Sequence, residues 1–90
     1  MIEVTLDGKR IALMGHETFM VQVGKGAKGS YKTRYKFNTG TPAGTPNPEG
    51  ALICLKEALF YYRGINVGNG YKKRLVCHEF NKPVLARMFT

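Results

Sequence analysis

Basic residues recur at every second position along one stretch of this chain. Three cations alternate with aromatic or threonine residues, in the order Tyr31, Lys32, Thr33, Arg34, Tyr35, Lys36 and Phe37. Because successive side chains of a β-strand point to opposite faces, this alternation predicts a strand over residues 30–38, with the cations on one face and the rings in the core. Cations on that face would lie about 6.5–7 Å apart, and we expect them to bind phosphate groups of a nucleic acid.

Other basic residues lie before and after this stretch. Lys25 and Lys28 belong to the glycine-rich segment 24–29, and Lys72, Lys73 and Arg74 are consecutive. In a strand, Lys72 and Arg74 would point one way and Lys73 the other. Residues 18–48 contain no acid, which leaves their positive charge uncompensated. The predicted nucleic-acid-binding residues are Lys25, Lys28, Lys32, Arg34, Lys36, Lys72, Lys73 and Arg74.

The net charge of the chain favours an anionic partner. The 90 residues include 14 Lys and Arg against 6 Asp and Glu, a formal charge of +8, and the pI is about 9.8. Because unpaired charge is costly to bury, this excess belongs on the surface. We expect nucleic acid as the partner, DNA rather than RNA. The alternative is a small accessory or phage-type protein that binds an acidic surface of another protein and inhibits or modulates it. A charge that serves only solubility, with strand lysines that block edge-to-edge aggregation, is the third interpretation.

Segment 24–29 matches a nucleotide-binding fingerprint without the required context. Its sequence, Gly-Lys-Gly-Ala-Lys-Gly, fits G-x-G-x-x-G. The dinucleotide-binding fingerprint needs a strand before it, a helix after it and an acid about 20 residues further on. Here a strand is expected to follow, and no acid occurs anywhere from residue 18 to residue 48. We therefore interpret the segment as a hairpin loop that presents Lys25 and Lys28.

The residues that could bind a metal or act as nucleophiles form no motif. They are His16, His78, Cys54 and Cys77. Cys77 and His78 are adjacent and would point to opposite faces of a strand, and the chain has neither a C-x₂₋₄-C nor an H-x₃₋₅-H pair. We expect no metal, no cofactor and no enzymatic activity. With two cysteines and no export signal, we expect reduced thiols and a cytoplasmic protein.

The remaining patterns divide the chain into strands, a loop and a tail. Apolar residues at alternate positions predict further strands over residues 2–6, 9–14 and 18–23. A last short strand is expected over residues 71–77. The pair Asp7-Gly8 is typical of a two-residue hairpin turn between the first two strands. Residues 39–48 contain three prolines and two glycines, so we expect a loop there. Residues 81–90 are expected to form a C-terminal tail.

The loop leads into a predicted helix. Asn47 suits the N-cap and Pro48 the first helical position, and Gly64 is expected to follow the last helical residue. Helical spacing groups one apolar stripe, formed by Ala51, Leu55, Ala58, Leu59 and Tyr62. Tyr61 lies off this stripe and Tyr71 precedes the basic cluster, so we expect these two rings to be exposed, where they could stack on bases.

These elements predict a small α+β domain over residues 1–80, with an antiparallel β-sheet of three to five strands packed on one α-helix in two layers. The other sheet face would be solvated and carry the three-cation row. This plan resembles that of AP2-type and integrase arm-type DNA-binding domains, but the chain has no Trp and lacks the Arg-Gly-Val signature of AP2 domains. We therefore assign no family. No apolar run approaches the ~18 residues of a membrane span, and we expect a monomer or homodimer without membrane contact.

Overall fold

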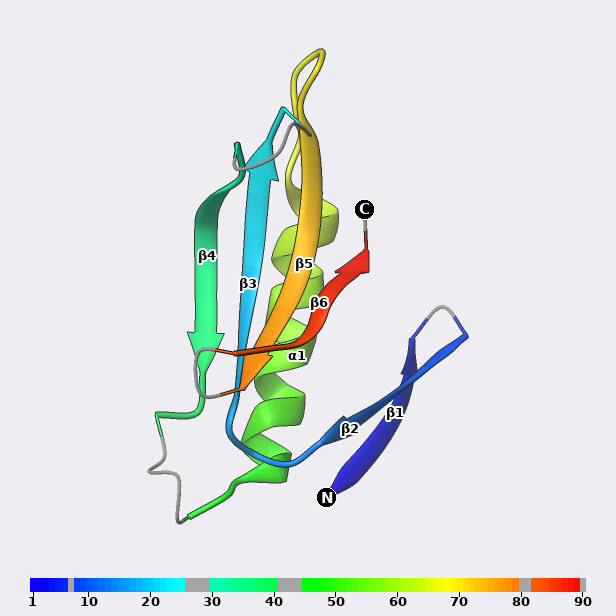
Figure 1. Cartoon of the computed structure of the whole chain (residues 1–90), viewed down its shortest axis with the longest axis vertical. Helices are drawn as coiled ribbons and strands as arrows, with labels where there is room; N and C mark the ends of the chain where they lie inside the picture. Colours follow the sequence, from blue (N-terminus) through cyan, green and yellow to red (C-terminus); the bar gives the residue numbers. More distant parts are fainter. Residues whose placement is uncertain (7, 26–29, 41–44, 80–81, 90) are drawn as a thin grey trace.

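A computed structural model of the chain describes residues 1–6, 8–25, 30–40, 45–79 and 82–89. Its elements, in chain order, are β1 (Ile2–Leu6), β2 (Lys9–Leu13), β3 (Glu17–Gly24), β4 (Lys32–Asn38), α1 (Pro48–Gly64), β5 (Lys72–Glu79) and β6 (Lys82–Phe89) (Figure 1). The strands predicted from alternation and the helix predicted from its caps begin and end within two residues of the expected positions.

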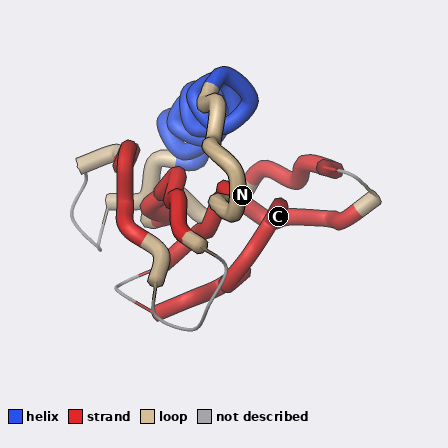
Figure 2. The backbone as a smooth tube through the Cα atoms, turned by 90° about the horizontal axis from the view of Figure 1, so that it is seen from above, coloured by secondary structure: helices blue, strands red, loops and turns tan. Residues whose placement is uncertain are grey.

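The strands form two antiparallel sheets. β1 and β2 make a separate hairpin, and the larger sheet has the order β4-β3-β5-β6. Helix α1 covers one face of the larger sheet, and seen from above it lies on one side of the strands (Figure 2). The predicted α+β class, with an antiparallel sheet and one helix in two layers, is confirmed.

Residues 82–89 form a strand where the sequence predicts a tail. β6 runs antiparallel to β5, with Leu85 opposite Cys77 and Phe89 opposite Leu75, and its register shifts twice along the pairing. The apolar residues of this segment are nearly consecutive and so show no strand period. Pairing with β6 satisfies backbone groups on an edge of β5 that would otherwise be left open.

The core lies between α1 and the larger sheet, and the β1–β2 hairpin closes one end of it. The four residues of the predicted stripe that are buried are Ala51, Leu55, Ala58 and Leu59. They pack against Phe19 and Val21 of β3 and Leu75 of β5, with Ile11 and Leu13 of β2 completing the cluster. Tyr62 is partly buried against the same cluster.

A polar corner joins the β2–β3 turn to the start of α1. The Glu17 carboxylate, only 1% exposed, accepts hydrogen bonds from the backbone N–H groups of Met14 at 2.7 Å and Gly15 at 2.8 Å. The Gly15 carbonyl accepts the backbone N–H of Asn47 at 3.3 Å. Gly15 has φ +114°, and an added Cβ would collide with the Asn47 backbone. Only glycine therefore fits this contact.

Both ends of α1 can be compared with the prediction. The Asn47 side chain accepts the backbone N–H of Gly50 at 3.0 Å, and Pro48 is the first helical residue, so the predicted N-cap is confirmed. At the other end, Gly64 is the last helical residue rather than the residue after it. Ile65 caps the helix in an extended conformation, and its N–H donates to the Tyr61 carbonyl at 3.1 Å.

Candidate nucleic-acid interface

Strand β4 does not carry its three cations on one face. Met20 and Gln22 are two residues apart in β3 and so share a face. Met20 lies opposite Lys36, but Gln22 lies opposite Thr33, because the register shifts between Val21 and Gln22. Such a bulge adds one residue to a strand and reverses the alternation beyond it. The predicted row of three cations on one face is therefore wrong.

Side-chain contacts agree with this reversal. Gln22 Nε2 donates to Thr33 Oγ1 at 3.1 Å, and the same hydroxyl lies 3.8 Å from the Met20 sulfur. Thr33 therefore lies with Lys36 on the sheet face turned away from α1, which we call the open face. Arg34 instead lines a hollow that includes residues of α1. Lys32 lies opposite Val23, two residues along β3 from the buried Val21.

The strand register gathers the predicted cations in a different way, at one end of the sheet. Lys25 directly follows β3, and Val23, near the end of that strand, lies between Lys32 of β4 and Lys73 of β5. Lys72 lies opposite Gly24 and Arg74 opposite Gln22, so the basic cluster of β5 lies at the same level. We call this set the basic end; its residues are Lys25, Lys32, Arg34, Lys72, Lys73 and Arg74.

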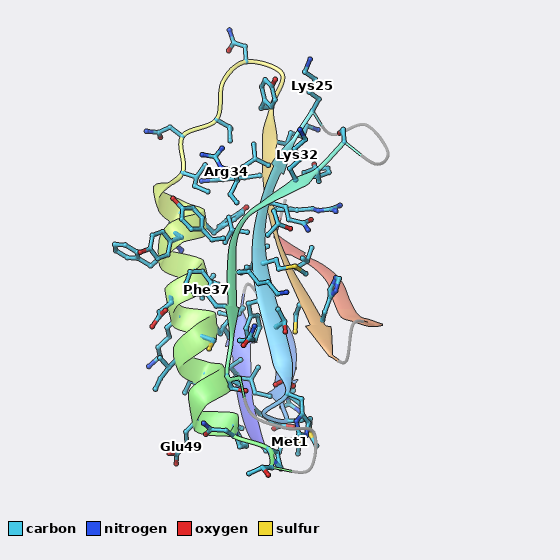
Figure 3. All side chains as sticks on the ribbon, turned by 90° about the vertical axis from the view of Figure 1, so that its left-hand side faces the viewer. Met1, Lys25, Lys32, Arg34, Phe37 and Glu49 are labelled. Atoms are coloured by element: carbon cyan, nitrogen blue, oxygen red, sulfur yellow. The ribbon has the colours of Figure 1, made fainter. Side chains whose placement is uncertain are left out.

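Positive charge is concentrated at this end of the molecule. Figure 3 places Lys25, Lys32 and Arg34 toward one end and Met1 and Glu49 toward the other. Neither residues 18–48 nor residues 58–78, which supply the basic end, contain an acid. The buried Glu17 lies at the opposite end of β3 from this set. The charge distribution is thus polarised along the long axis, whose extent is 42 Å.

Two members of the basic end are held by contacts within the fold. Lys73 Nζ donates to the Ile65 carbonyl at 3.3 Å and lies 4.8 Å from the centroid of the Tyr62 ring. Both groups belong to α1 or the segment after it, so Lys73 joins β5 to the helix. Cation–π contact and hydrogen bonding fix the position of this charge.

The Arg74 guanidinium is fixed on the open face. Its Nε donates to Gln22 Oε1 at 2.7 Å, and its central carbon lies 3.9 Å from the centroid of the Tyr31 ring. Lys73 and Arg74 thus point to opposite faces, as predicted. Tyr31 is predicted to lie in the core but instead packs against Arg74 on the open face. The bulge in β4 reverses the alternation of faces, so Tyr31 shares the open face with Thr33.

The other predicted cations are exposed or lie apart. Lys25, Lys32, Arg34 and Lys72 are exposed at the basic end, and Lys25 Nζ lies 5.6 Å from the centroid of the Tyr71 ring. Lys36 is exposed on the open face, where it lines a hollow of about 210 Å³ with Thr18, Met20, Gln22 and His78. Lys28 lies outside the described residues.

Sequence reasoning missed a cluster of aromatic rings beside the basic end. The Tyr61 ring stacks on Tyr35, with centroids 4.5 Å apart, and on Phe37, at 5.5 Å. Phe60 meets Tyr61 edge-on at 5.5 Å and is 74% exposed. Tyr35 and Tyr61 are 36% and 39% exposed. The predicted exposure of Tyr61 and Tyr71 is confirmed, and a helical wheel that places Tyr61 off the buried stripe would also have identified Phe60.

The cysteines and histidines form no group in the part of the chain that the structure describes. Neither Cys54 nor Cys77 forms a disulfide there. Burial raises the pKa of the Cys54 thiol, and the nearby Glu57 carboxylate raises it further. Within the same residues, no three His, Cys, Asp or Glu side chains lie together where they could hold a metal ion.

No helix among the described residues combines the length and the apolar character of a membrane span. Comparison of the chain with models of protein families, with curated protein sequences and with solved structures finds no match in any of the three.

Proposed function

We propose that this protein binds nucleic acid by contacting backbone phosphates with its basic end. One observation carries the proposal: three adjacent strands bring six cations to one end of the fold, from segments that contain no acid. Uncompensated Lys and Arg on a rigid scaffold attract phosphates and release the counterions condensed on a nucleic acid.

The six cations divide into two roles. Lys25, Lys32, Arg34 and Lys72 are exposed, so their charged groups can contact phosphate oxygens directly. Lys73 and Arg74 are half-buried and held by Ile65, Tyr62, Gln22 and Tyr31. Their positions are set before binding, so they add positive potential at no cost in side-chain entropy on association.

The size of the basic end suits a nucleic acid. The fold measures 24 × 18 Å across its long axis, and duplex DNA carries one charge per 1.7 Å of its axis, or about 14 charges over 24 Å. About half of these charges face the protein, which is still at least as many as the six cations, so the number of cations limits the number of contacts.

Salt dependence tests the proposal. If all six cations contact or neutralise phosphates on duplex DNA, the logarithm of the association constant falls against the logarithm of salt concentration with a slope of about −5. Affinity then falls about 10³-fold between 50 and 200 mM salt. We would measure it by fluorescence anisotropy with a labelled duplex of about 20 base pairs. A salt-independent affinity, or no binding at 50 mM salt to either this duplex or a single strand of the same length, would refute the proposal.

Single substitutions locate the surface. Lys32→Gln should weaken binding and make the salt slope less steep by about 1, since one phosphate contact is lost. Arg10→Gln removes another exposed cation, from β2 and outside the basic end, and should change neither quantity. Lys36→Gln should resemble Arg10→Gln; an effect equal to that of Lys32→Gln would favour contact along the length of β4 instead.

A protein partner would give a different result. Should an acidic protein surface be the ligand, purification would yield a stoichiometric protein that survives nuclease treatment, and the duplex would not bind at low salt. A 260 nm absorbance excess that nuclease removes supports nucleic acid.

A further inference from the structure

We infer that the nucleic acid is single-stranded where it leaves the basic end, and that an unstacked base binds in a hollow between β4 and the carboxyl end of α1. This inference depends on the proposed function and specifies its substrate. The hollow has a volume of about 360 Å³, and its lining includes Arg34, Tyr35, Phe60, Tyr61, Ile65 and Asn66. That volume falls within the roughly 300–1,000 Å³ of small-molecule sites.

The lining of the hollow offers the groups that recognise an exposed base. Tyr35 and Tyr61 are stacked on each other, and Phe60 stands edge-on to Tyr61 with three-quarters of its surface exposed. Aromatic faces stack on any base, because every base has a π-face. Asn66 also lines the hollow, and its carboxamide can both donate and accept hydrogen bonds, as the edge of a base requires.

The hollow is continuous with the basic end. Arg34 belongs to both, since the bulge in β4 turns it toward α1. Ile65, which lines the hollow, also accepts the hydrogen bond from Lys73. A strand whose phosphates contact Lys25 and Lys32 can therefore continue past Arg34 and place its next base against the rings.

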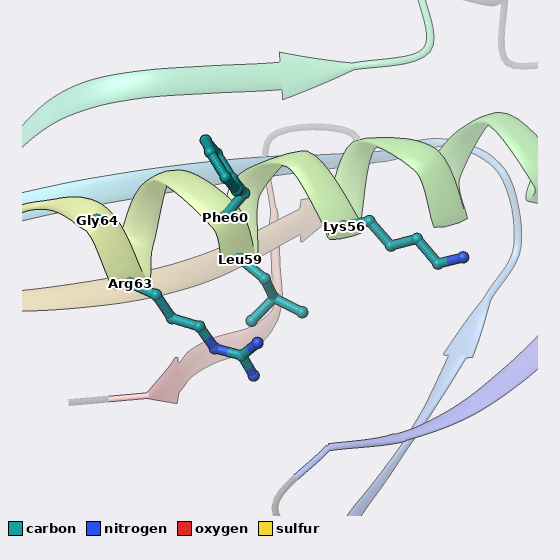
Figure 4. A pocket seen from close by; sticks show the side chains of 5 residues that line it. All are labelled: Lys56, Leu59, Phe60, Arg63 and Gly64. Atoms are coloured by element: carbon teal, nitrogen blue, oxygen red, sulfur yellow. The ribbon is translucent and has the colours of Figure 1, made fainter.

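A second hollow extends the same surface along α1. It has a volume of about 520 Å³ and is lined by Lys56, Leu59, Phe60, Arg63 and Gly64. Figure 4 shows Leu59 and Arg63 projecting from α1 on the opposite side from Phe60. Phe60 thus contributes to both hollows and has cations to either side, Arg34 in one and Lys56 and Arg63 in the other. These charges suit the phosphates that flank a bound base.

Single-stranded nucleic acid is the occupant that this chemistry favours. In a duplex, bases are stacked on each other and their faces are not accessible to side chains, whereas in a single strand they can be splayed onto aromatic rings. The hollow shares Arg34 with the basic end and lies beside the other five cations of that end, so it is complementary in charge to a polyanion. A purely apolar partner would leave Arg34 without an anion.

The test compares Phe60→Ala on two ligands, an oligodeoxythymidylate of about 20 nucleotides and a duplex of the same length. Phe60→Ala removes the ring on which a base would stack, and loss of one stacking contact should weaken single-strand affinity about 5- to 150-fold. Duplex affinity should change less than twofold, since the duplex uses only the cations. Phe60→Tyr keeps the ring and should restore single-strand binding. Oligouridylate in a third arm distinguishes RNA from DNA.

Ile53→Ala is the matched control. Ile53 is an exposed apolar residue of the same helix, 58% accessible, and it lines neither hollow. It should leave both affinities unchanged. If the wild-type protein binds both ligands and Phe60→Ala weakens neither, or weakens both equally, the base-binding hollow is refuted while the basic end stands. If the wild-type protein binds neither ligand, both proposals are refuted.

Discussion

The polar corner at Glu17 gives a quantitative prediction about stability. Glu17→Gln keeps the size of a side chain that is 1% exposed but leaves one acceptor oxygen for two backbone donors, the N–H groups of Met14 and Gly15. A hydrogen bond to a charged group contributes about 1.5–3 kcal/mol. Losing one of the two hydrogen bonds to Glu17 should lower the free energy of unfolding by that amount, because one backbone N–H is then left inside the fold without an acceptor.

The expected loss is large for a chain of this length. At roughly 0.05–0.15 kcal/mol per residue, the whole domain has a stability of about 5–14 kcal/mol. Each kcal/mol shifts Tm by roughly 4–8 °C in a domain of this size, so Tm should fall by about 6–24 °C. Urea unfolding followed by circular dichroism measures the free energy of unfolding. The m-value should not change, because unfolding exposes the same surface area in the variant as in the wild type.

Glu3→Gln is the control for the loss of one negative charge. Glu3 is exposed in β1. Replacing it with Gln changes the net charge as Glu17→Gln does, and should alter the free energy of unfolding by no more than about 0.5 kcal/mol. Equal effects from Glu3→Gln and Glu17→Gln would refute the reasoning, because the cost would then come from charge and not from the two hydrogen bonds.

Two further predictions concern Arg74 and Cys54. Arg74→Ala removes the hydrogen bond to Gln22 and the contact with the Tyr31 ring, so it should destabilise the fold by about 1–2 kcal/mol in urea unfolding as well as reduce the salt slope of binding; a loss of slope without destabilisation would contradict its structural role. The raised pKa of Cys54 means that the folded state retains its proton above the ordinary thiol value of 9.0. Stability from this group is present below that pH and falls as pH rises above it, and Cys54→Ala should remove this alkaline decline in thermal unfolding experiments.

Local patterns were enough to predict the helix and most strands. Asn47 and Pro48 specify where α1 begins because an N-cap acceptor and a fixed φ act within a few residues. Alternation identifies β1 to β4 for a similar reason, since the period of a strand is a property of its own backbone. The segment of β6 has no such period, and it becomes a strand only because β5 offers an edge to pair with.

The composition of the candidate site could be predicted better than its arrangement. Six of the eight predicted cations lie together, but they do so through the pairing of three strands and not along one. The order of the sheet is a tertiary property, and it places Lys72 and Lys73 beside Gly24 and Val23, about fifty residues away in the chain. Phe60 could be found from helical spacing alone, but its contact with Tyr61 and its place beside Arg34 could not.

The sequence alone establishes the excess of positive charge, the acid-free segments that carry it, and the type of nearly every element. The location of that charge in space is a property of the fold. The bulge in β4 arises from its pairing with β3, and one added residue reverses the face of every side chain beyond it. Arg34 therefore lies beside the rings of α1 and not in a row with Lys36, because the face of a strand residue depends on its partner strand as well as on its own neighbours.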